Sequence, residues 1–172
     1  MRIVVATDDP IAGLLTRHAR PLERLAASYA PAAADRDDLL QEIALALWTA
    51  MPGFRGECSE KTFVLRVAHN RALSFLTKRG RAGIPVDDVE ESVVASSGKN
   101  PAIAYERKER GSQLLAAARA LPIGHRQVIT LLLEDLSHRE IAEVLGTTEN
   151  NVAVRANRAR AAMRVLLEPP GG

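Results

Sequence analysis

Apolar residues recur at intervals of three and four along most of the chain, the spacing that places side chains on one face of an α-helix. Close to the N-terminus, this predicted face comprises Ile11, Leu14, Leu15, His18, Leu22 and Leu25. Asp9 followed by Pro10 predicts the start of this helix, because aspartate caps free N–H groups and proline fits the first turn. We expect the helix to continue to about Tyr29, with a kink at Pro21.

Two more helices are predicted before residue 80. One begins near Asp35, ends at a Pro-Gly pair after Met51, and has the apolar positions Leu39, Leu40, Ile43, Leu47 and Trp48. The other begins after Ser59, a residue type that caps helices, and ends at Gly80. Its apolar positions are Phe63, Val64, Val67, Ala68, Leu73, Phe75 and Leu76.

Residues 81–100 mix Gly, Pro, Ser and acidic residues without periodicity, which is typical of a linker. Helical spacing resumes after Pro101 and is interrupted at Leu121-Pro122. The pattern therefore predicts an all-α protein with a three-helix domain over 10–80, a flexible linker over 81–100 and a second helical domain over 101–168. The composition agrees, since 47% of residues are hydrophobic but only 3% are aromatic, which favours helices over sheets.

A helix-turn-helix is predicted in the second domain. Ser137 and Glu140 have the spacing of a capping box, which opens a short helix with Ile141, Ala142 and Leu145 facing inward. Gly146 permits a sharp turn, and Thr147 or Thr148 can cap the helix that follows. The second helix buries a face with spacings of three and four, which comprises Val152, Ala156, Ala159 and Met163.

Polar side chains lie on the other side of this last helix, toward its N-terminal half. They suit base edges in a major groove, since Asn can form two hydrogen bonds with adenine and Arg two with guanine. The candidate DNA-binding residues are Asn150, Asn151, Val154, Arg155, Asn157 and Arg158. The alternative interpretation is an ordinary helical hairpin with a solvated charged face.

Charge is distributed in blocks, although the formal net charge is only +2. Residues 31–60 carry six acidic residues against two arginines, a local charge of −4, whereas residues 61–86 contain six basic residues and no acid. The last helix also has four arginines and no acid between residues 150 and 167. The acidic segment would repel DNA, and basic elements that flank an acidic one are more organised than a solubilising surface requires.

The second domain resembles the fourth conserved region of bacterial sigma factors, through Leu121-Pro122, Glu140-Ile141-Ala142, Gly146 and Arg158-Ala159-Arg160. In the first domain, the segments DDLLQE (37–42) and LRVAHN (65–70) resemble the polymerase-binding and minus-ten regions of the same family. With these two regions and a short linker, the chain is similar to the extracytoplasmic-function (ECF) group. The resemblance implies a transcription initiation factor that binds core RNA polymerase and recognises minus-ten and minus-thirty-five promoter elements.

Specific residues follow from this resemblance. The helix that docks on the clamp coiled coil of the largest polymerase subunit matches Asp37, Asp38, Gln41 and Glu42. The helix that receives the minus-ten strand as it melts matches Phe63, Arg66, Asn70 and Arg71. Capturing a flipped base costs a few kcal/mol of stacking, which aromatic and cationic contacts must offset. Phe63 stands where the family usually has tryptophan, and core packing is an equally good account of it.

The implied partners are core polymerase, through the clamp and the flap of the second-largest subunit, promoter DNA, and an anti-sigma factor. Ala153 replaces a frequent lysine, and Asn150-Asn151 replace the usual glycine-threonine pair, so the promoter sequence cannot be deduced from the family.

Two other functions fit parts of the sequence. A stand-alone dimeric helix-turn-helix regulator would explain residues 112–166 but not DDLLQE or the basic segment 61–79. A metal-dependent nuclease could use Asp35, Asp37, Asp38 and Glu42, although helix capping explains these acids more simply.

We expect no enzyme activity, no cofactor and no metal, because one cysteine, Cys58, and scattered histidines lack the spacing of metal ligands. The histidines are His18, His69, His125 and His138. The absence of a signal segment or a long apolar run predicts a cytoplasmic protein.

Overall fold

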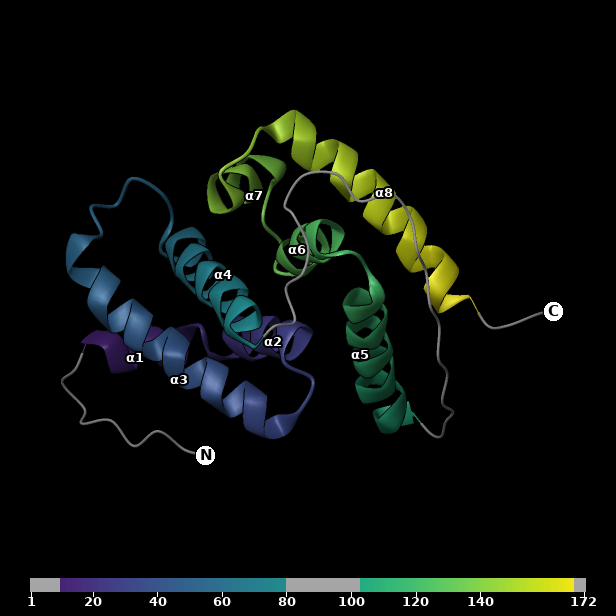
Figure 1. Cartoon of the computed structure of the whole chain (residues 1–172), viewed down its shortest axis with the longest axis horizontal. Coiled ribbons are helices and arrows are strands. Elements are labelled where there is room, and N and C mark those ends of the chain that lie inside the picture. Colours follow the sequence, from purple (N-terminus) through teal and green to yellow (C-terminus); the bar gives the residue numbers. More distant parts are fainter. Residues whose placement is uncertain (1–9, 80–102, 169–172) are drawn as a thin grey trace.

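The computed structural model describes residues 10–79 and 103–168, and the described residues are helical with short connections (Figure 1). The predicted all-α fold is confirmed. The elements are α1 (Pro10–Arg17), α2 (Ala19–Tyr29), α3 (Ala33–Ala50), the 3-10 turn η1 (Met51–Gly53), α4 (Glu60–Lys78), α5 (Ile103–Ala120), α6 (Ile123–Leu132), α7 (His138–Leu145) and α8 (Glu149–Leu167). The predicted linker, 81–100, lies outside the described residues. No described helix is both long and apolar enough to cross a bilayer.

The first predicted helix is two helices, and the break lies at His18 rather than at Pro21. Proline in a helix has no N–H to donate, and its ring crowds the carbonyl four residues earlier. The helix therefore breaks just after Arg17, and Pro21 becomes part of the first turn of α2. Residues 10–79 thus contain four α-helices rather than the three predicted.

Helices α2, α3 and α4 pack together in the N-terminal unit, which we define as residues 10–79. Its fully buried side chains include Leu25, Leu39, Ile43, Leu47 and Leu65. Trp48, the last of the apolar positions of this helix, does not join the core, since this residue is 63% exposed. Each helical residue turns by about 100°, so the buried series at 39, 43 and 47 leaves position 48 on another face.

The C-terminal unit, residues 103–168, contains the predicted helix-turn-helix in α7 and α8. Ser137 and Glu140 form the capping box, and Gly146 ends α7 in the left-handed conformation with φ 64°. Of the two candidate caps for α8, Thr148 is the one used, since its side chain accepts a hydrogen bond from the Asn151 N–H. The predicted inner face of α8 is confirmed, since Val152, Ala156, Ala159 and Met163 are all buried.

The two units lie against each other, with α7 beside α4 and with α5 and α6 beside α2 (Figure 1). We call this contact the seam. One apolar cluster crosses it and includes Leu25 and Leu65 from the N-terminal unit and Val128, Leu131 and Ile141 from the C-terminal unit. The two helical domains predicted from the sequence therefore share a hydrophobic core in this structure.

Polar contacts also join the units across the seam. The Arg24 guanidinium pairs with the Glu134 carboxylate, and the buried Thr130 hydroxyl donates to Ser28 Oγ at 3.4 Å. At the start of α4, the Lys61 ammonium donates to the backbone carbonyl of Glu134. The start of α4 is thus held by the turn that precedes the helix-turn-helix.

Candidate functional site

The acidic residues predicted to bind polymerase lie along the first half of α3. Asp37, Asp38 and Gln41 are exposed, and Glu42 is partly exposed. Asp38 Oδ2 lies 3.2 Å from Arg79 Nη2, and Glu42 Oε2 lies 3.7 Å from Arg71 Nη1. The acidic and basic blocks of the sequence therefore neutralise each other in part where α3 and α4 pack.

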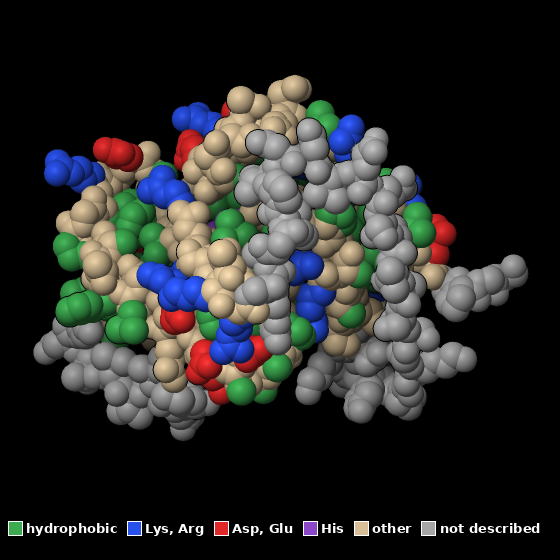
Figure 2. Space-filling model, viewed as in Figure 1, with side chains coloured by type: hydrophobic (Ala, Val, Ile, Leu, Met, Phe, Trp, Pro, Cys, Tyr) green, Lys and Arg blue, Asp and Glu red, His purple; other side chains and the backbone are tan. Residues whose placement is uncertain are grey.

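Figure 2 shows red and blue side chains side by side over the start of α3 and the end of α4. Asp35 also pairs with Arg79, and its predicted alternative role as a metal ligand gains no support from this contact. Among the described residues, no group of three or more His, Cys, Asp or Glu side chains is placed to hold a metal ion.

Two exposed apolar side chains, Leu45 and Trp48, continue this face toward the C-terminal end of α3. Their exposed fractions are 65% and 63%. Gln41, Leu45 and Trp48 are spaced by four and three residues, so they form one stripe on the helix surface. Large apolar groups exposed beside charged groups mark a surface that another protein covers. The exposure of these two side chains was not expected from the sequence, in which Trp48 is one of the apolar positions of the helix.

The acidic residues and the apolar stripe together make one surface, which we call the α3 surface. It comprises Asp37, Asp38, Gln41, Glu42, Leu45 and Trp48. A shallow groove between α3 and α4 opens beside it, lined by Asp38, Gln41, Glu42, Leu45, Phe75, Lys78 and Arg79.

The four residues predicted for the minus-ten element lie on α4 but differ in accessibility. Asn70 is exposed, whereas Phe63 is only 7% exposed. The Phe63 ring packs on Phe54 with centroids 4.5 Å apart, and Arg66 Cζ lies 5.7 Å from the centroid of the Phe63 ring. Arg71 is paired with Glu42. In this structure Phe63 is therefore a core side chain, whereas Asn70 is exposed and Arg66 and Arg71 are partly exposed.

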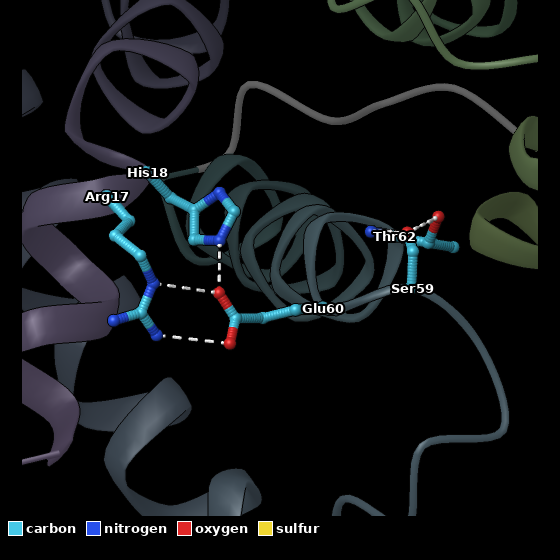
Figure 3. A network of polar contacts seen from close by, with 5 residues as sticks. All are labelled: Arg17, His18, Ser59, Glu60 and Thr62. Carbon is cyan, nitrogen blue, oxygen red and sulfur yellow. Dashed lines mark hydrogen bonds and ion pairs between the residues drawn. The ribbon is translucent and has the colours of Figure 1, made fainter.

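The start of α4 is fixed by two sets of polar contacts (Figure 3). The Ser59 hydroxyl accepts the Thr62 N–H and caps the helix, as predicted. Glu60 accepts two hydrogen bonds of 3.1 Å from the Arg17 guanidinium and lies 2.8 Å from His18 Nε2. The Arg17 guanidinium and then His18 hold the pKa of Glu60 below its usual range. The break between α1 and α2 therefore places two basic groups on the first residue of α4.

The recognition helix α8 presents its polar face to solvent. Asn150, Val154, Asn157 and Arg158 are exposed, and Asn151 and Arg155 are partly exposed. Val154 is 43% exposed, an apolar side chain within a polar face. The capping residues and the buried opposite face hold α8 rigidly, so these side chains project from a fixed backbone.

The Arg155 side chain points toward α6, unlike the exposed polar side chains of α8. Its guanidinium Nη1 lies 3.6 Å from the point that a Cβ on Gly124 would occupy, so it extends over the first turn of α6. Next to Gly124, burial and then the charges of Arg158 and Arg155 lower the pKa of His125. His125 is one of four histidines scattered along the sequence, and only the packing of α6 on α8 brings it to this face.

Comparison with known proteins identifies two regions of the chain. Residues 14–82 match the model of sigma-70 region 2, and residues 112–163 match that of sigma-70 region 4. Together they span more than half of the chain. The regulator hypothesis left the first region unexplained, and the match to region 2 argues against it.

Individual relatives agree with this assignment. The ECF RNA polymerase sigma-E factor of Escherichia coli strain K12 is 29% identical over 164 residues, which cover 91% of this chain and 85% of that protein. The RNA polymerase sigma factor NccH of Alcaligenes xylosoxydans is 27% identical over 158 residues, covering 90% and 85%.

Solved structures share the fold. The sigma factor RpoE of Bartonella quintana, in complex with the anti-sigma factor NepR, matches with a TM-score of 0.68 at 20% identity, over 93% of this chain and 98% of that one. CnrH, in complex with the cytosolic domain of CnrY, gives a TM-score of 0.66 at 23% identity, over 94% and 89%. With regions 2 and 4 matched in the expected order, this chain belongs to the sigma-70 family of RNA polymerase sigma factors, in its extracytoplasmic-function group.

Proposed function

We propose that this sigma factor binds core RNA polymerase through the α3 surface and directs initiation by contacting two promoter elements with α4 and α8. The observation that carries this division of labour is the exposure of two chemically different surfaces. The α3 surface combines acids with exposed Leu45 and Trp48, whereas α8 exposes asparagines and arginines. The α3 surface suits a partner protein with basic and apolar groups, and the exposed face of α8 suits DNA.

The α3 surface has the composition expected of an energetic contact. Tryptophan is enriched at sites where a single side chain dominates binding, and Trp48 is 63% exposed in the free chain. Acidic residues around it would meet basic groups of the clamp coiled coil in the largest polymerase subunit. The C-terminal unit would in turn contact the flap of the second-largest subunit.

For the minus-ten element, we propose that Arg66 and Asn70 make the first contacts with the melted strand. Both are accessible on α4, whereas Arg71 is paired with Glu42. A stacking role for Phe63 requires this ring to leave its contact with Phe54. We therefore propose Phe63 as a residue that acts only after α4 and the preceding loop rearrange on polymerase.

For the minus-thirty-five element, we propose base contacts from Asn150, Asn151, Val154, Asn157 and Arg158 of α8. The helix belongs to a helix-turn-helix, in which residues of the N-terminal half of the second helix face the major groove. The proposed domains are 10–80 for region 2 and 101–168 for region 4, joined by 81–100.

The proposed activity is binding and duplex opening without a catalytic group of this chain, in the cytoplasm where polymerase acts. Because the solved RpoE structure is a complex with an anti-sigma factor, we also propose that an anti-sigma protein binds this chain. The α3 surface and the seam are the regions that such a partner would cover.

The experiment mixes the purified chain with core RNA polymerase and follows complex formation by size-exclusion chromatography and run-off transcription on genomic DNA. We expect a one-to-one complex that initiates at discrete sites. Initiation at random sites, or no complex, would contradict the proposal. A dimer that binds a palindrome without polymerase would instead identify a stand-alone regulator.

A further inference from the structure

Three basic side chains lie near one another where the start of α6 packs against α8, at the edge of the base-reading stripe of the recognition helix. His125 belongs to α6, and Arg155 and Arg158 belong to α8. The Arg155 guanidinium lies over the first turn of α6, 3.6 Å from the Cβ position of Gly124. Burial, and then the charges of Arg158 and Arg155, lower the pKa of His125.

Neither arginine forms an ion pair with any carboxylate of the described residues, in contrast to Arg17, Arg24 and Arg79. Like charges brought together without an acid between them repel each other, and an anion placed among them removes this repulsion. The cluster is therefore better suited to binding an anion than to stabilising the free fold.

The backbone adds to this preference. No side chain caps α6, whose N-cap residue is Pro122, and the partial positive charge at a helix start attracts anions. Gly124 leaves the first turn uncovered by a side chain of its own. The basic side chains define the location, and the helix start supplements them.

We propose that His125 and Arg155, beside the base-reading Arg158, bind a DNA backbone phosphate and so fix the register of α8 in the major groove. Arg155 is then a positioning residue rather than a base reader. The inference rests on the proposed function of α8, since it assigns the phosphate to the DNA strand that borders the groove. Phosphate contacts set orientation without carrying sequence information.

The test measures binding of the full chain to a fluorescein-labelled 30-base-pair duplex of arbitrary sequence, by anisotropy over a series of salt concentrations. A lost phosphate contact reduces the slope of log affinity against log salt by about one. We expect this reduction, and an affinity about tenfold lower at low salt, for Arg155→Ala. His125→Gln should weaken binding by a smaller factor.

Arg164→Ala is the matched control, because it removes the same charge from the same helix nine residues away. The slope of log affinity against log salt should be closer to that of the parent chain for Arg164→Ala than for Arg155→Ala. A slope unchanged by Arg155→Ala, or changed equally by Arg164→Ala, would overturn the proposal. An effect of Arg155→Ala on one DNA sequence but not on others would show base reading instead.

Gly124→Asp tests the same site without removing a basic group. A Cβ at this position makes ordinary contacts, and an aspartate in the first turn stabilises a helix. Its carboxylate would occupy the place of the phosphate, so we expect DNA binding to fall while the midpoint of thermal unfolding is kept or raised. Retained DNA binding in a folded Gly124→Asp chain would contradict the site.

These outcomes separate the inference from the proposed function. If the chain fails to form a complex with core polymerase, the sigma role of its surfaces fails, yet the salt dependence on arbitrary DNA still reports on the phosphate site. If Arg155→Ala assembles with polymerase but keeps the full salt slope, only the phosphate site fails.

Discussion

Arg24 of α2 and Glu134 of the turn after α6 form a bidentate ion pair across the seam, with both N···O distances at 2.6 Å and 110 residues between them in the sequence. The Glu134 side chain is only 2% exposed, whereas that of Arg24 is 48% exposed. Removing the arginine would leave the buried carboxylate without its cation. An unpaired buried charge strongly destabilises the folded state.

We therefore expect Arg24→Ala to lower the free energy of unfolding by about 2 to 3 kcal/mol, a value reduced because one partner is half-exposed. Urea unfolding followed by circular dichroism measures the change. Arg20→Ala, an exposed arginine of the same helix, should cost less than about 0.5 kcal/mol. Equal losses for the two variants would show that the ion pair does not stabilise the seam.

The seam must open for both promoter elements to be reached together. The minus-ten and minus-thirty-five elements are separated by about 25 base pairs, or about 85 Å of B-DNA, whereas α4 contacts α7 directly. We expect a disulfide across the buried contact of Ser28 with Thr130, made by Ser28→Cys and Thr130→Cys in a Cys58→Ser background, to abolish promoter-directed transcription. Reduction should restore it, and the single-cysteine variants should stay active. Full activity of the cross-linked chain would mean that initiation does not require separation of the units.

Substitutions on the α3 surface should weaken binding to core polymerase and leave DNA binding intact. Trp48→Ala should weaken the complex with core polymerase by at least about tenfold, because an exposed tryptophan that becomes buried contributes about 2 kcal/mol or more. Charge reversal at Asp38 and Glu42 should act in the same direction. Arg20→Ala, which removes an exposed side chain of α2 outside the α3 surface, serves as the control in a fluorescence titration. Unchanged affinity for Trp48→Ala would place the polymerase contact elsewhere.

Val154 predicts apolar contact with a thymine methyl group in the promoter, since this side chain is exposed within a polar recognition face. Replacing that thymine by uracil removes the methyl and should lower binding of the holoenzyme about threefold to fourfold. The same replacement should have little effect on Val154→Ser, whose side chain lacks the methyls. Scanning each thymine of the minus-thirty-five element in both proteins tests this, and equal losses in the two would exclude the contact.

Arg158→Ala tests the separation of the two surfaces from the DNA side. Arg158 is exposed on α8, far in sequence from the α3 surface. We expect promoter-directed run-off transcription to fall at least about tenfold, the value of one lost bidentate contact, while the affinity for core polymerase is kept. Loss of polymerase binding in this variant would contradict the assigned division of labour.

Acid sensitivity is predicted from His69, which is buried beside Tyr29 with its Nδ1 3.2 Å from the tyrosine hydroxyl. Burial lowers the pKa of His69 to about 4 from 6.5. The unfolded chain therefore binds a proton between these values while the folded chain does not, so stability falls as pH drops below about 6.5. The full difference between these two pKa values corresponds to a loss of about 3 kcal/mol in the free energy of unfolding.

Urea unfolding between pH 7.5 and 4.5 measures this loss, with nuclear magnetic resonance to follow the titration of the ring. Tyr29→Phe should keep the acid sensitivity, because burial rather than the hydroxyl causes the shift. His69→Leu should reduce it. A His69 ring that titrates near 6.5 in the folded chain would rule out the explanation.

Local signals explain which parts of this structure were predictable. The capping box of Ser137 and Glu140, the left-handed Gly146 and the cap at Ser59 each act within a few residues, so the sequence alone locates them. The exposed stripe of Leu45 and Trp48 was not predicted, since an apolar residue one position from a buried one reads as core. The pairing of Arg24 with Glu134, and the approach of His125 to Arg155, depend on packing between distant segments.

The apolar cluster that crosses the seam has a consequence for protein engineering and for divergence among relatives. Val128, Leu131 and Ile141 complete a core that begins with Leu25 and Leu65, so the hydrophobic interior of the N-terminal unit is not wholly its own, although the C-terminal unit has a second apolar cluster of its own residues. A hybrid that joined residues 10–79 to the region 4 of another sigma factor would inherit cavities or clashes at this junction. Region 2 and region 4 of this chain are therefore expected to tolerate substitution jointly, and to be poor modules for exchange.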